Sequence, residues 1–220
     1  MRTETETRLD SYGQWIFRLR PARREPGHLV LLLHGWTGDE DSMWILARNL
    51  PDRHIALAPR APFSAPEGGF SWRDIQPGSW GFPSLEDLRP AAEALLEFVD
   101  GWSASAGVDA GRMDLLGFSQ GAAMCYVLVC LFPDRVRALA ALSGFVPDGV
   151  EAAFSPAALA GKPVFIAHGR QDDMVPPERA RRSAALLRAA GAQVSYCESD
   201  GGHKVSRECL RAMEAFFRRT

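Results

Sequence analysis

The sequence predicts an α/β fold built on one mostly parallel sheet with helices on both faces. Strand-like and helix-like segments alternate along the 220 residues, and several strand-like segments are apolar at almost every position. Such runs suit parallel strands that helices cover on both sides. The length suits one α/β domain, and no linker, repeat or low-complexity tract divides the chain, so we expect a single domain over residues 1–220.

Seven segments are expected to form strands, because each is a short apolar or alternating run bounded by polar or turn-forming residues. They are residues 15–20, 28–35, 54–62, 112–118, 135–145, 162–169 and 192–199. The run at 28–35, HLVLLLHG, is the most apolar near the start and indicates a strand in the middle of the sheet.

Helices are expected where apolar residues recur at helical intervals. They are residues 40–50, 84–107, 120–132, 176–191 and 206–220. Ser84 followed by Asp87 resembles a capping box, and prolines at 176–177 with Gly191 fit the start and end of the fourth helix. Residues 63–83 form a loop too long for a simple connection, and residues 147–161 have no clear pattern.

Charge and composition favour an ordinary enzyme-like surface. The formal net charge is −2 and the arginines are scattered, so nothing indicates a nucleic-acid partner. The first 14 residues lack the apolar core of a signal peptide, and no later run is long enough to span a bilayer. We therefore expect a cytoplasmic protein, monomeric or homodimeric, that acts on a small molecule.

The cysteines show no CxxC pair and no metal-type spacing with the five histidines. We expect four free, mostly buried thiols, at Cys125, Cys130, Cys197 and Cys209. No nucleotide-binding fingerprint is present either, so neither a metal nor a cofactor is expected. Among the histidines, His28 and His54 are expected in solvent-facing loops and His168 in a hydrogen-bonding role at a strand end.

The stretch Gly117-Phe118-Ser119-Gln120-Gly121 places a serine between two glycines where a predicted strand turns into a helix. A tight strand-to-helix turn can hold a serine hydroxyl above the sheet edge, and a Cβ at the flanking positions would collide with nearby backbone. The helix that follows supplies a backbone N–H and a positive dipole end for an oxyanion. The alternative is a turn that uses these residues for shape alone.

A serine nucleophile needs a base and a group that orients the base, and both follow in the order Ser, Asp, His. Asp172 and Asp173 come directly after a predicted strand, and His203 lies in the glycine-rich loop before the last helix. Loops at the carboxyl ends of parallel strands can converge. Asp172 is favoured over Asp173, which could cap a local turn, and over Asp200, which lies too near His203 along the chain.

Four motifs together resemble the phospholipase/carboxylesterase family of small α/β-hydrolases, which includes bacterial carboxylesterases and acyl-protein thioesterases. They are LLLHGWTGDEDSMW, GFSQGAAM, HGRQDDMVP and GGH, and the likeness runs from about Val30 to the C-terminus. The resemblance implies a three-layer α/β-hydrolase fold without a separate cap domain. It also implies cleavage of carboxylic esters or thioesters, with Ser119 as nucleophile, Asp172 as acid and His203 as base.

The same resemblance suggests that the backbone N–H groups of Trp36 and Gln120 hold the oxyanion. The motif around Trp36 departs from the family's usual HGLGD, because HGWTGDE is one residue longer and carries a bulky Trp36. Since only the backbone of that position is required, catalysis should survive while the mouth of the site changes shape. The aromatic loop 63–83 lies where similar enzymes build a substrate wall.

Several apolar side chains could line a groove over Ser119, although any one of the aromatic residues could instead pin the long loop to the body. The candidates are Phe70, Trp72, Trp80, Phe82, Met174 and Val175, with Trp72 favoured. The expected reaction is ester hydrolysis through an acyl-enzyme. Thioester, lysophospholipid or peptide cleavage by the same triad, and ligand binding without catalysis, are the alternatives.

Overall fold

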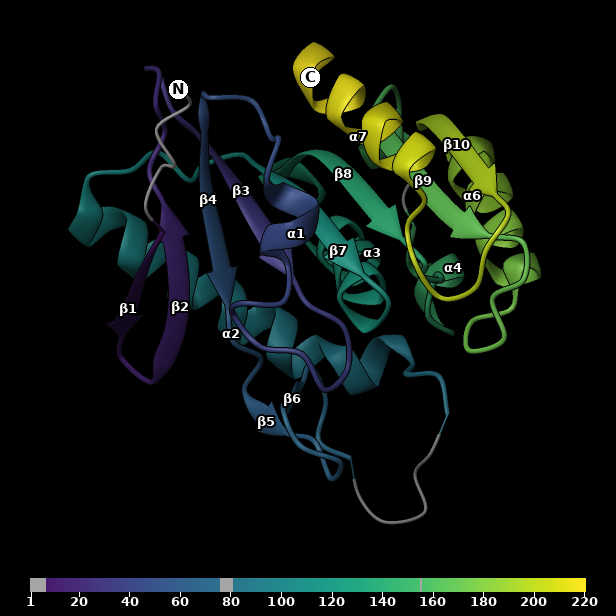
Figure 1. Ribbon diagram of the computed structural model, residues 1–220, viewed down its shortest axis with the longest axis horizontal. Coiled ribbons are helices and arrows are strands. Elements are labelled where there is room, and N and C mark those ends of the chain that lie inside the picture. Colours follow the sequence, from purple (N-terminus) through teal and green to yellow (C-terminus); the bar gives the residue numbers. More distant parts are fainter. Residues whose placement is uncertain (1–6, 76–80, 155) are drawn as a thin grey trace.

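An eight-stranded sheet forms the centre of the computed structural model, which describes residues 7–75, 81–154 and 156–220 (Figure 1). Its strands lie in the order β1-β2-β4-β3-β7-β8-β9-β10. Their bounds are β1 Arg8–Tyr12, β2 Trp15–Arg20, β3 His28–Leu33, β4 His54–Pro59, β7 Met113–Phe118, β8 Val136–Leu142, β9 Pro163–Gly169 and β10 Gln193–Ser199. The strands from β4 to β10 in this order pair in parallel, so the predicted mostly parallel sheet is confirmed.

The first two strands pair antiparallel and form one edge of the sheet. β2 was predicted, but β1 was not, because no residue of β1 is buried and its sequence lacks an apolar face. In the sheet, β1 pairs only with β2, from Arg8 opposite Leu19 to Tyr12 opposite Trp15. An edge strand of this kind leaves little hydrophobic signal in the sequence.

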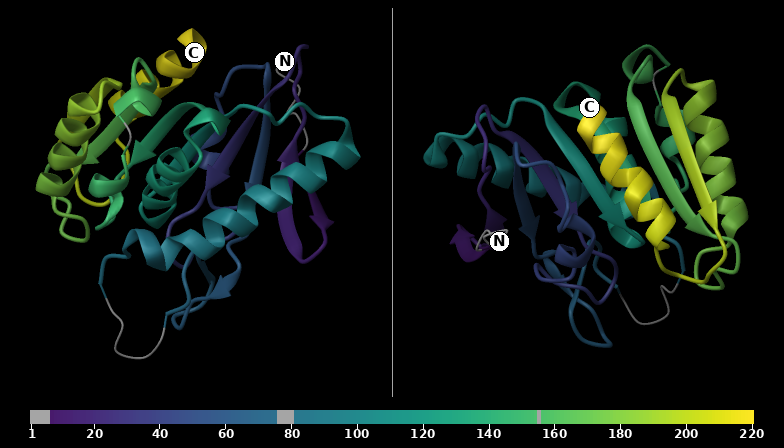
Figure 2. Two further views of the ribbon diagram at one scale, coloured as in Figure 1. Left: turned by 180° about the vertical axis from the view of Figure 1, so that it is seen from behind. Right: turned by 45° about the horizontal axis from the view of Figure 1, so that its top comes forward.

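Helices cover both faces of the sheet, as Figure 2 shows. One face carries α2 (Leu85–Ala106), α3 (Gln120–Leu131) and α6 (Pro177–Ala189), and the other carries α1 (Trp44–Ala47) and α7 (Arg207–Arg219). Alternate residues of β3 enter two separate cores, with Leu31 in the first and Val30 and Leu32 in the second. This division explains why the strand is apolar at consecutive positions.

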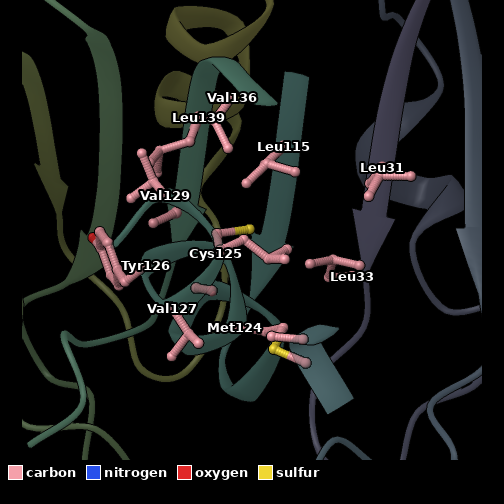
Figure 3. Close-up of a cluster of buried hydrophobic side chains, with 14 of the residues drawn as sticks. Leu31, Leu33, Leu115, Met124, Cys125, Tyr126, Val127, Val129, Val136 and Leu139 are labelled. Carbon is pink, nitrogen blue, oxygen red and sulfur yellow. The ribbon is translucent and has the colours of Figure 1, made fainter. Parts of the chain in front are cut away.

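Helix α3 lies in the larger core, where it packs against β7 and β8 (Figure 3). Met124, Cys125, Tyr126 and Val127 are consecutive and all fully buried, so the helix has no solvent-facing side near its middle. A helix that is apolar all round is fixed by packing on every side. The start of α3, directly after Ser119, is therefore firmly placed.

Two loops contain more structure than the sequence indicated. The segment 63–83 holds a two-stranded hairpin, β5 (Phe63–Ser64) and β6 (Phe70–Ser71), and the unassigned segment 147–161 holds α4 (Val150–Ala153) and α5 (Pro156–Leu159). Apart from this hairpin, the described residues form no second sheet and no cap domain.

The expected helix 40–50 was too long, since only Trp44–Ala47 is helical. The side chains of Asp39 and Ser42 hydrogen-bond each other and nearby backbone N–H groups, which favours turns over a longer helix. The predicted capping box of α2 is confirmed, because the Ser84 hydroxyl accepts from the Asp87 N–H and the Asp87 carboxylate accepts from the Ser84 N–H.

The prediction of four free thiols is wrong for one pair. Cys197 in β10 and Cys209 in α7 form a disulfide with their Cα atoms 5.6 Å apart, whereas Cys125 and Cys130 are free. The sequence separation of 12 residues matches no disulfide motif, and only the packing of α7 beside β10 brings the two together. Disulfides are more typical of oxidising compartments than of the cytoplasm, so the cytoplasmic location stays a prediction.

The expectation of a solvent-facing His54 is also wrong. His54 begins β4 and is fully buried. Its Nε2 lies 2.9 Å from the carboxylate of Asp114 in β7. His28 is half-buried at the start of β3. None of the helices in the described ranges is long and apolar enough to cross a membrane.

Candidate active site

Ser119 lies in the turn between β7 and α3, with φ 55° and ψ −117°. A non-glycine residue with this backbone conformation is strained, and such strain is found at functional turns. Both flanking glycines are required by close approach. A Cβ on Gly117 would lie 2.3 Å from the Gly121 carbonyl oxygen, and one on Gly121 would lie 2.0 Å from the Leu33 carbonyl oxygen. The expected steric reason for the two glycines is confirmed.

The three residues predicted to form a triad lie together, at the carboxyl ends of three parallel strands. His203 Nε2 is 3.0 Å from Ser119 Oγ, and His203 Nδ1 is 2.8 Å from Asp172 Oδ2. Ser119 follows β7, Asp172 follows β9 and His203 follows β10. The side chain of Asp172 is fully buried, whereas His203 and Ser119 remain reachable from solvent.

Asp172 is the only one of the three candidate acids that contacts His203. Its Oδ1 accepts hydrogen bonds from the backbone N–H groups of Met174 and Val175, at 3.0 and 2.9 Å. Asp173 is exposed, and Asp200 pairs instead with Arg170. The turn-capping role that the sequence left open for Asp173 thus belongs to Asp172, which leaves its Oδ2 for His203.

His168, at the end of β9, has the hydrogen-bonding role predicted for it. Its Nε2 lies 2.8 Å from the Val175 carbonyl oxygen and 3.3 Å from Asp172 Oδ2. Because a carbonyl only accepts, Nε2 carries a proton and donates to Val175. The buried imidazole therefore helps to fix the chain segment that holds Asp172.

The Trp36 loop, residues 34–38, passes over Ser119 from the end of β3. His34 is fully buried; its Nδ1 donates to the Gly35 carbonyl oxygen at 2.7 Å, and its Nε2 accepts from the Ala61 N–H at 3.0 Å. Burial lowers the pKa of His34, which agrees with the neutral ring that this pair of bonds requires. Trp36 and Gln120 face the space above Ser119 from opposite sides.

Gln120 is the first residue of α3, and N–H groups in the first turn of a helix have no acceptor within the helix. Its side chain has a second use that the sequence did not reveal. Gln120 Oε1 accepts from the Trp72 backbone N–H at 2.9 Å, and Nε2 donates to Ser71 Oγ at 3.1 Å. The glutamine of GFSQG thus ties strand β6 to the turn at Ser119.

The expectation that Trp72 lines a substrate groove is wrong. Trp72 is fully buried, and its Nε1 donates to the His34 carbonyl oxygen at 2.8 Å. It supports the Trp36 loop from beneath, which is the pinning role that the sequence left as the alternative. Phe70 packs under the guanidinium of Arg60, 4.6 Å from its ring centre. Trp80 lies outside the described residues.

Two hollows flank Trp36. The first, which we call the Phe82 cavity, has a volume of about 330 Å³ and opens directly over Ser119. Three of the predicted wall residues line it, namely Phe82, Met174 and Val175. Its other lining residues include Trp36, Arg73, Ile75, Gln120 and Phe145. Phe82 is held against Phe145, with ring centres 4.7 Å apart, and under the Arg179 guanidinium.

The second hollow, which we call the Ile45 groove, was not foreseen from the sequence. It has a volume of about 540 Å³ and lies between α1 and α7, on the other side of Trp36. Met43 and Ala47 are buried, as the apolar spacing of the segment suggested, whereas Ile45 is 78% exposed and lines this groove. Its apolar walls are Met43, Ile45, Leu46, Phe118, Val205 and Leu210.

Comparison with known proteins identifies the family and supports the fold. The family model described as Phospholipase/Carboxylesterase matches residues 16–220. The chain is 30% identical to MhqD of Bacillus subtilis (strain 168) over 182 residues, which cover 82% of this chain and 87% of that protein. It is 26% identical to acyl-protein thioesterase 1 of Gibberella zeae over 200 residues, which cover 84% of each.

Among solved structures, the carboxylesterase from Mesorhizobium loti superposes with a TM-score of 0.80 at 25% identity. The match covers 97% of this chain and 99% of that one. The fold, the order of its elements and the length are therefore shared with an esterase along almost the whole chain.

Proposed function

Because the chain belongs to the phospholipase/carboxylesterase family, we propose that it is a serine carboxylesterase with Ser119, His203 and Asp172 as its catalytic triad. The observation that carries the proposal is the unbroken hydrogen-bond chain from Ser119 Oγ through His203 to Asp172. Two hydrogen bonds of ordinary length join a strained, solvent-reachable serine to a buried carboxylate. A structural turn needs neither the base nor the acid.

In the first half of the reaction, Ser119 Oγ attacks the ester carbonyl carbon while His203 Nε2 takes the hydroxyl proton. Asp172, fixed by two backbone donors, holds the Nδ1–H tautomer and stabilises the imidazolium that forms. The N–H groups of Trp36 and Gln120 hold the oxyanion. The carbon–oxygen bond to the alcohol then breaks, and His203 returns its proton to the departing oxygen.

In the second half, water attacks the acyl group on Ser119 with His203 again as the base. The bond to Ser119 Oγ breaks, the proton returns to that oxygen, and the carboxylic acid leaves. Loss of one oxyanion donor usually costs a factor of about 10² to 10³ in rate, so the position of the Trp36 loop matters as much as the triad. No cofactor enters either half.

The test is Ser119→Ala assayed with p-nitrophenyl acetate and with a fluorophosphonate probe, which reacts with activated serines. We expect kcat to fall by about 10⁴-fold or more and labelling to disappear. Ser105→Ala, on the exposed end of α2, is the matched control and should keep both. Turnover or labelling that persists in Ser119→Ala at the wild-type rate would overturn the proposal.

Thioester cleavage is the second candidate, favoured by the similarity to a protein named acyl-protein thioesterase 1. The same triad can expel a thiolate, and the geometry around Ser119 does not distinguish the two leaving atoms. Matched oxygen and sulfur esters with the same acyl group separate the candidates by kcat/KM. An amide in the same series tests peptidase activity, in which His203 would have to protonate the leaving amine.

A further inference from the structure

The Ile45 groove meets the active site at the imidazole of His203. His203 and Lys204 line this groove, whereas Ser119 and Gln120 line the Phe82 cavity. Phe118, in the floor of the groove, packs against the His203 ring with ring centres 5.1 Å apart. The two hollows are thus continuous with opposite sides of the same reaction centre, and Trp36 belongs to both.

The chemistry of the reaction decides which half of an ester enters each hollow. The departing oxygen must receive a proton from His203, so the leaving group extends on the side where His203 is exposed. The acyl carbon becomes bonded to Ser119 Oγ, and Ser119 lines the Phe82 cavity, so the acyl chain extends into that hollow. We propose that the Ile45 groove is the leaving-group site and selects esters of bulky apolar alcohols that are neutral or anionic.

The exposed apolar side chains support this assignment. Four large apolar side chains are exposed among the described residues, namely Leu9, Tyr12, Ile45 and Met174. Leu9 and Tyr12 belong to the edge strand β1, far from the site in sequence and structure. The other two each line one of the hollows beside Ser119. When an apolar ligand covers exposed apolar surface at the mouth of a site, the removal of that surface from water contributes favourably to the free energy of binding.

The charge of Lys204 in the Ile45 groove limits which alcohols the groove can accept. Lys204 is the one permanently charged side chain among the groove's lining residues, and in the described part of the chain it forms no ion pair. Two acidic residues lie four positions from Lys204 in sequence: Asp200 is paired with Arg170, and Glu208 forms no ion pair with Lys204. A cationic alcohol would meet an uncompensated positive charge beside His203, whereas a carboxylate or phosphate would be attracted.

This inference rests on the proposed esterase function, and the test separates the two. The variant Ile45→Asn is assayed with 1-naphthyl acetate and methyl acetate, which share an acyl group. We expect the ratio of their kcat/KM values to fall about tenfold, the size typical of a lost apolar contact in a binding pocket. Leu9→Asn, at another exposed apolar residue that lies away from the site, is the control and should leave the ratio within twofold of wild type.

A second variant gives the opposite pattern. Met174→Asn in the Phe82 cavity should change the ratio between methyl hexanoate and methyl acetate, which differ only in the acyl chain. It should not change the ratio between the two acetates. If Ile45→Asn instead shifted acyl preference, or neither variant shifted either ratio, the assignment of the groove would be overturned while the triad remained intact.

The rate of deacylation distinguishes a leaving-group residue from a residue whose substitution distorts the whole site, because a distortion would slow deacylation as well as acylation. The alcohol has departed before the acyl-enzyme is hydrolysed, so a leaving-group residue acts only on the first half of the reaction. Burst kinetics with 1-naphthyl acetate should show slower acylation in Ile45→Asn and an acetyl-enzyme that decays within twofold of the wild-type rate. Equal slowing of both steps would contradict the proposal.

The charge is tested with acetylcholine and 3,3-dimethylbutyl acetate, its uncharged carbon analogue. Wild type should favour the neutral ester, and Lys204→Gln should raise the acetylcholine-to-analogue ratio about two- to fivefold, as expected for one exposed charge pair. An unchanged ratio would remove the charge selection from the proposal. Turnover that persists in Ser119→Ala would instead contradict the esterase function itself.

Discussion

The Trp36 loop and the His203 loop, residues 200–206, flank Ser119 from opposite sides but are fixed by different interactions. The Trp36 loop is held by buried hydrogen bonds from Trp72, Ala61 and the ring of His34. The His203 loop is bracketed by the Cys197–Cys209 disulfide. It also rests against the end of β9, where a Cβ on Gly169 would lie 2.3 Å from the Gly202 carbonyl oxygen.

This difference makes the two sides sensitive to different conditions. A disulfide is broken by a thiol reductant and is indifferent to protons between pH 5 and 8. A buried neutral histidine responds to acid and is indifferent to reductants. A reductant should therefore destabilise the His203 loop and acid should destabilise the Trp36 loop, although both loops flank the same serine.

Breaking the disulfide should have the largest effect. It closes a segment of 12 residues, and a closed loop of about this length stabilises a fold by about 3 kcal/mol. We expect dithiothreitol to lower the free energy of unfolding in urea by about that amount. It should also lower kcat/KM for p-nitrophenyl acetate, because His203 lies inside the released segment.

The double variant Cys197→Ala/Cys209→Ala is the control for this prediction. It should have the stability of the reduced protein and show no further response to dithiothreitol, even though Cys125 and Cys130 are still present. Four titratable thiols in the unreduced, denatured wild type would mean that the disulfide does not form, and this distinction between the two loops would then be lost.

Trp72→Phe tests the Trp36 loop and should lower the free energy of unfolding by less than reduction of the disulfide does. The variant removes the N–H that reaches the His34 carbonyl oxygen and leaves a small void in the core. We expect a loss of about 2 kcal/mol in the free energy of unfolding. Because the Trp36 loop loses support, kcat should fall more than KM rises.

Acyl-chain preference distinguishes support from direct contact. Trp72 lines neither hollow, so Trp72→Phe should keep the wild-type order of rates for p-nitrophenyl acetate, butyrate and octanoate. Phe82→Leu, which alters a wall of the Phe82 cavity, should change that order. A changed order in Trp72→Phe alone would return Trp72 to the substrate wall that its sequence position suggested.

The sequence was sufficient for the parts of the site that depend on backbone geometry. Gly117 and Gly121 leave room that any side chain would fill, and the strand ends before Ser119, Asp172 and His203 all point to one edge of a parallel sheet. Such placement follows from local patterns together with the rule that parallel strands share an edge. These contacts could therefore be predicted without coordinates.

The sequence was insufficient where packing between distant segments decides the outcome. Trp72 lies in an aromatic loop whose sequence would also suit a substrate groove. Only its hydrogen bond to the His34 carbonyl oxygen shows that the Trp72 side chain points into the core. Cys197 and Cys209 become partners because α7 lies beside β10, and Ile45 is exposed although it lies within α1 between the buried residues Met43 and Ala47. Each depends on a neighbour that no local pattern specifies.

Acid should weaken the Trp36 loop by a smaller amount than the other two changes. In the folded protein, burial lowers the pKa of His34 below its usual value near 6.5, and a proton on Nε2 would break the bond from the Ala61 N–H. The unfolded chain therefore binds the proton first as the pH falls. The stabilisation from a neutral His34 is present above pH 6.5 and is lost progressively below it.

Between pH 6.5 and 5.5 this loss is at most about 1 kcal/mol of unfolding free energy, the limit reached when the unfolded ring titrates at its usual pKa and the folded ring stays neutral. Urea unfolding of wild type and His34→Asn at both pH values measures it, because the other histidines are common to both proteins and cancel. The variant should lose less unfolding free energy than wild type over this interval. Equal losses would mean that His34 takes no part, and that the loop on its side of Ser119 is no more acid-sensitive than the disulfide-bound loop opposite.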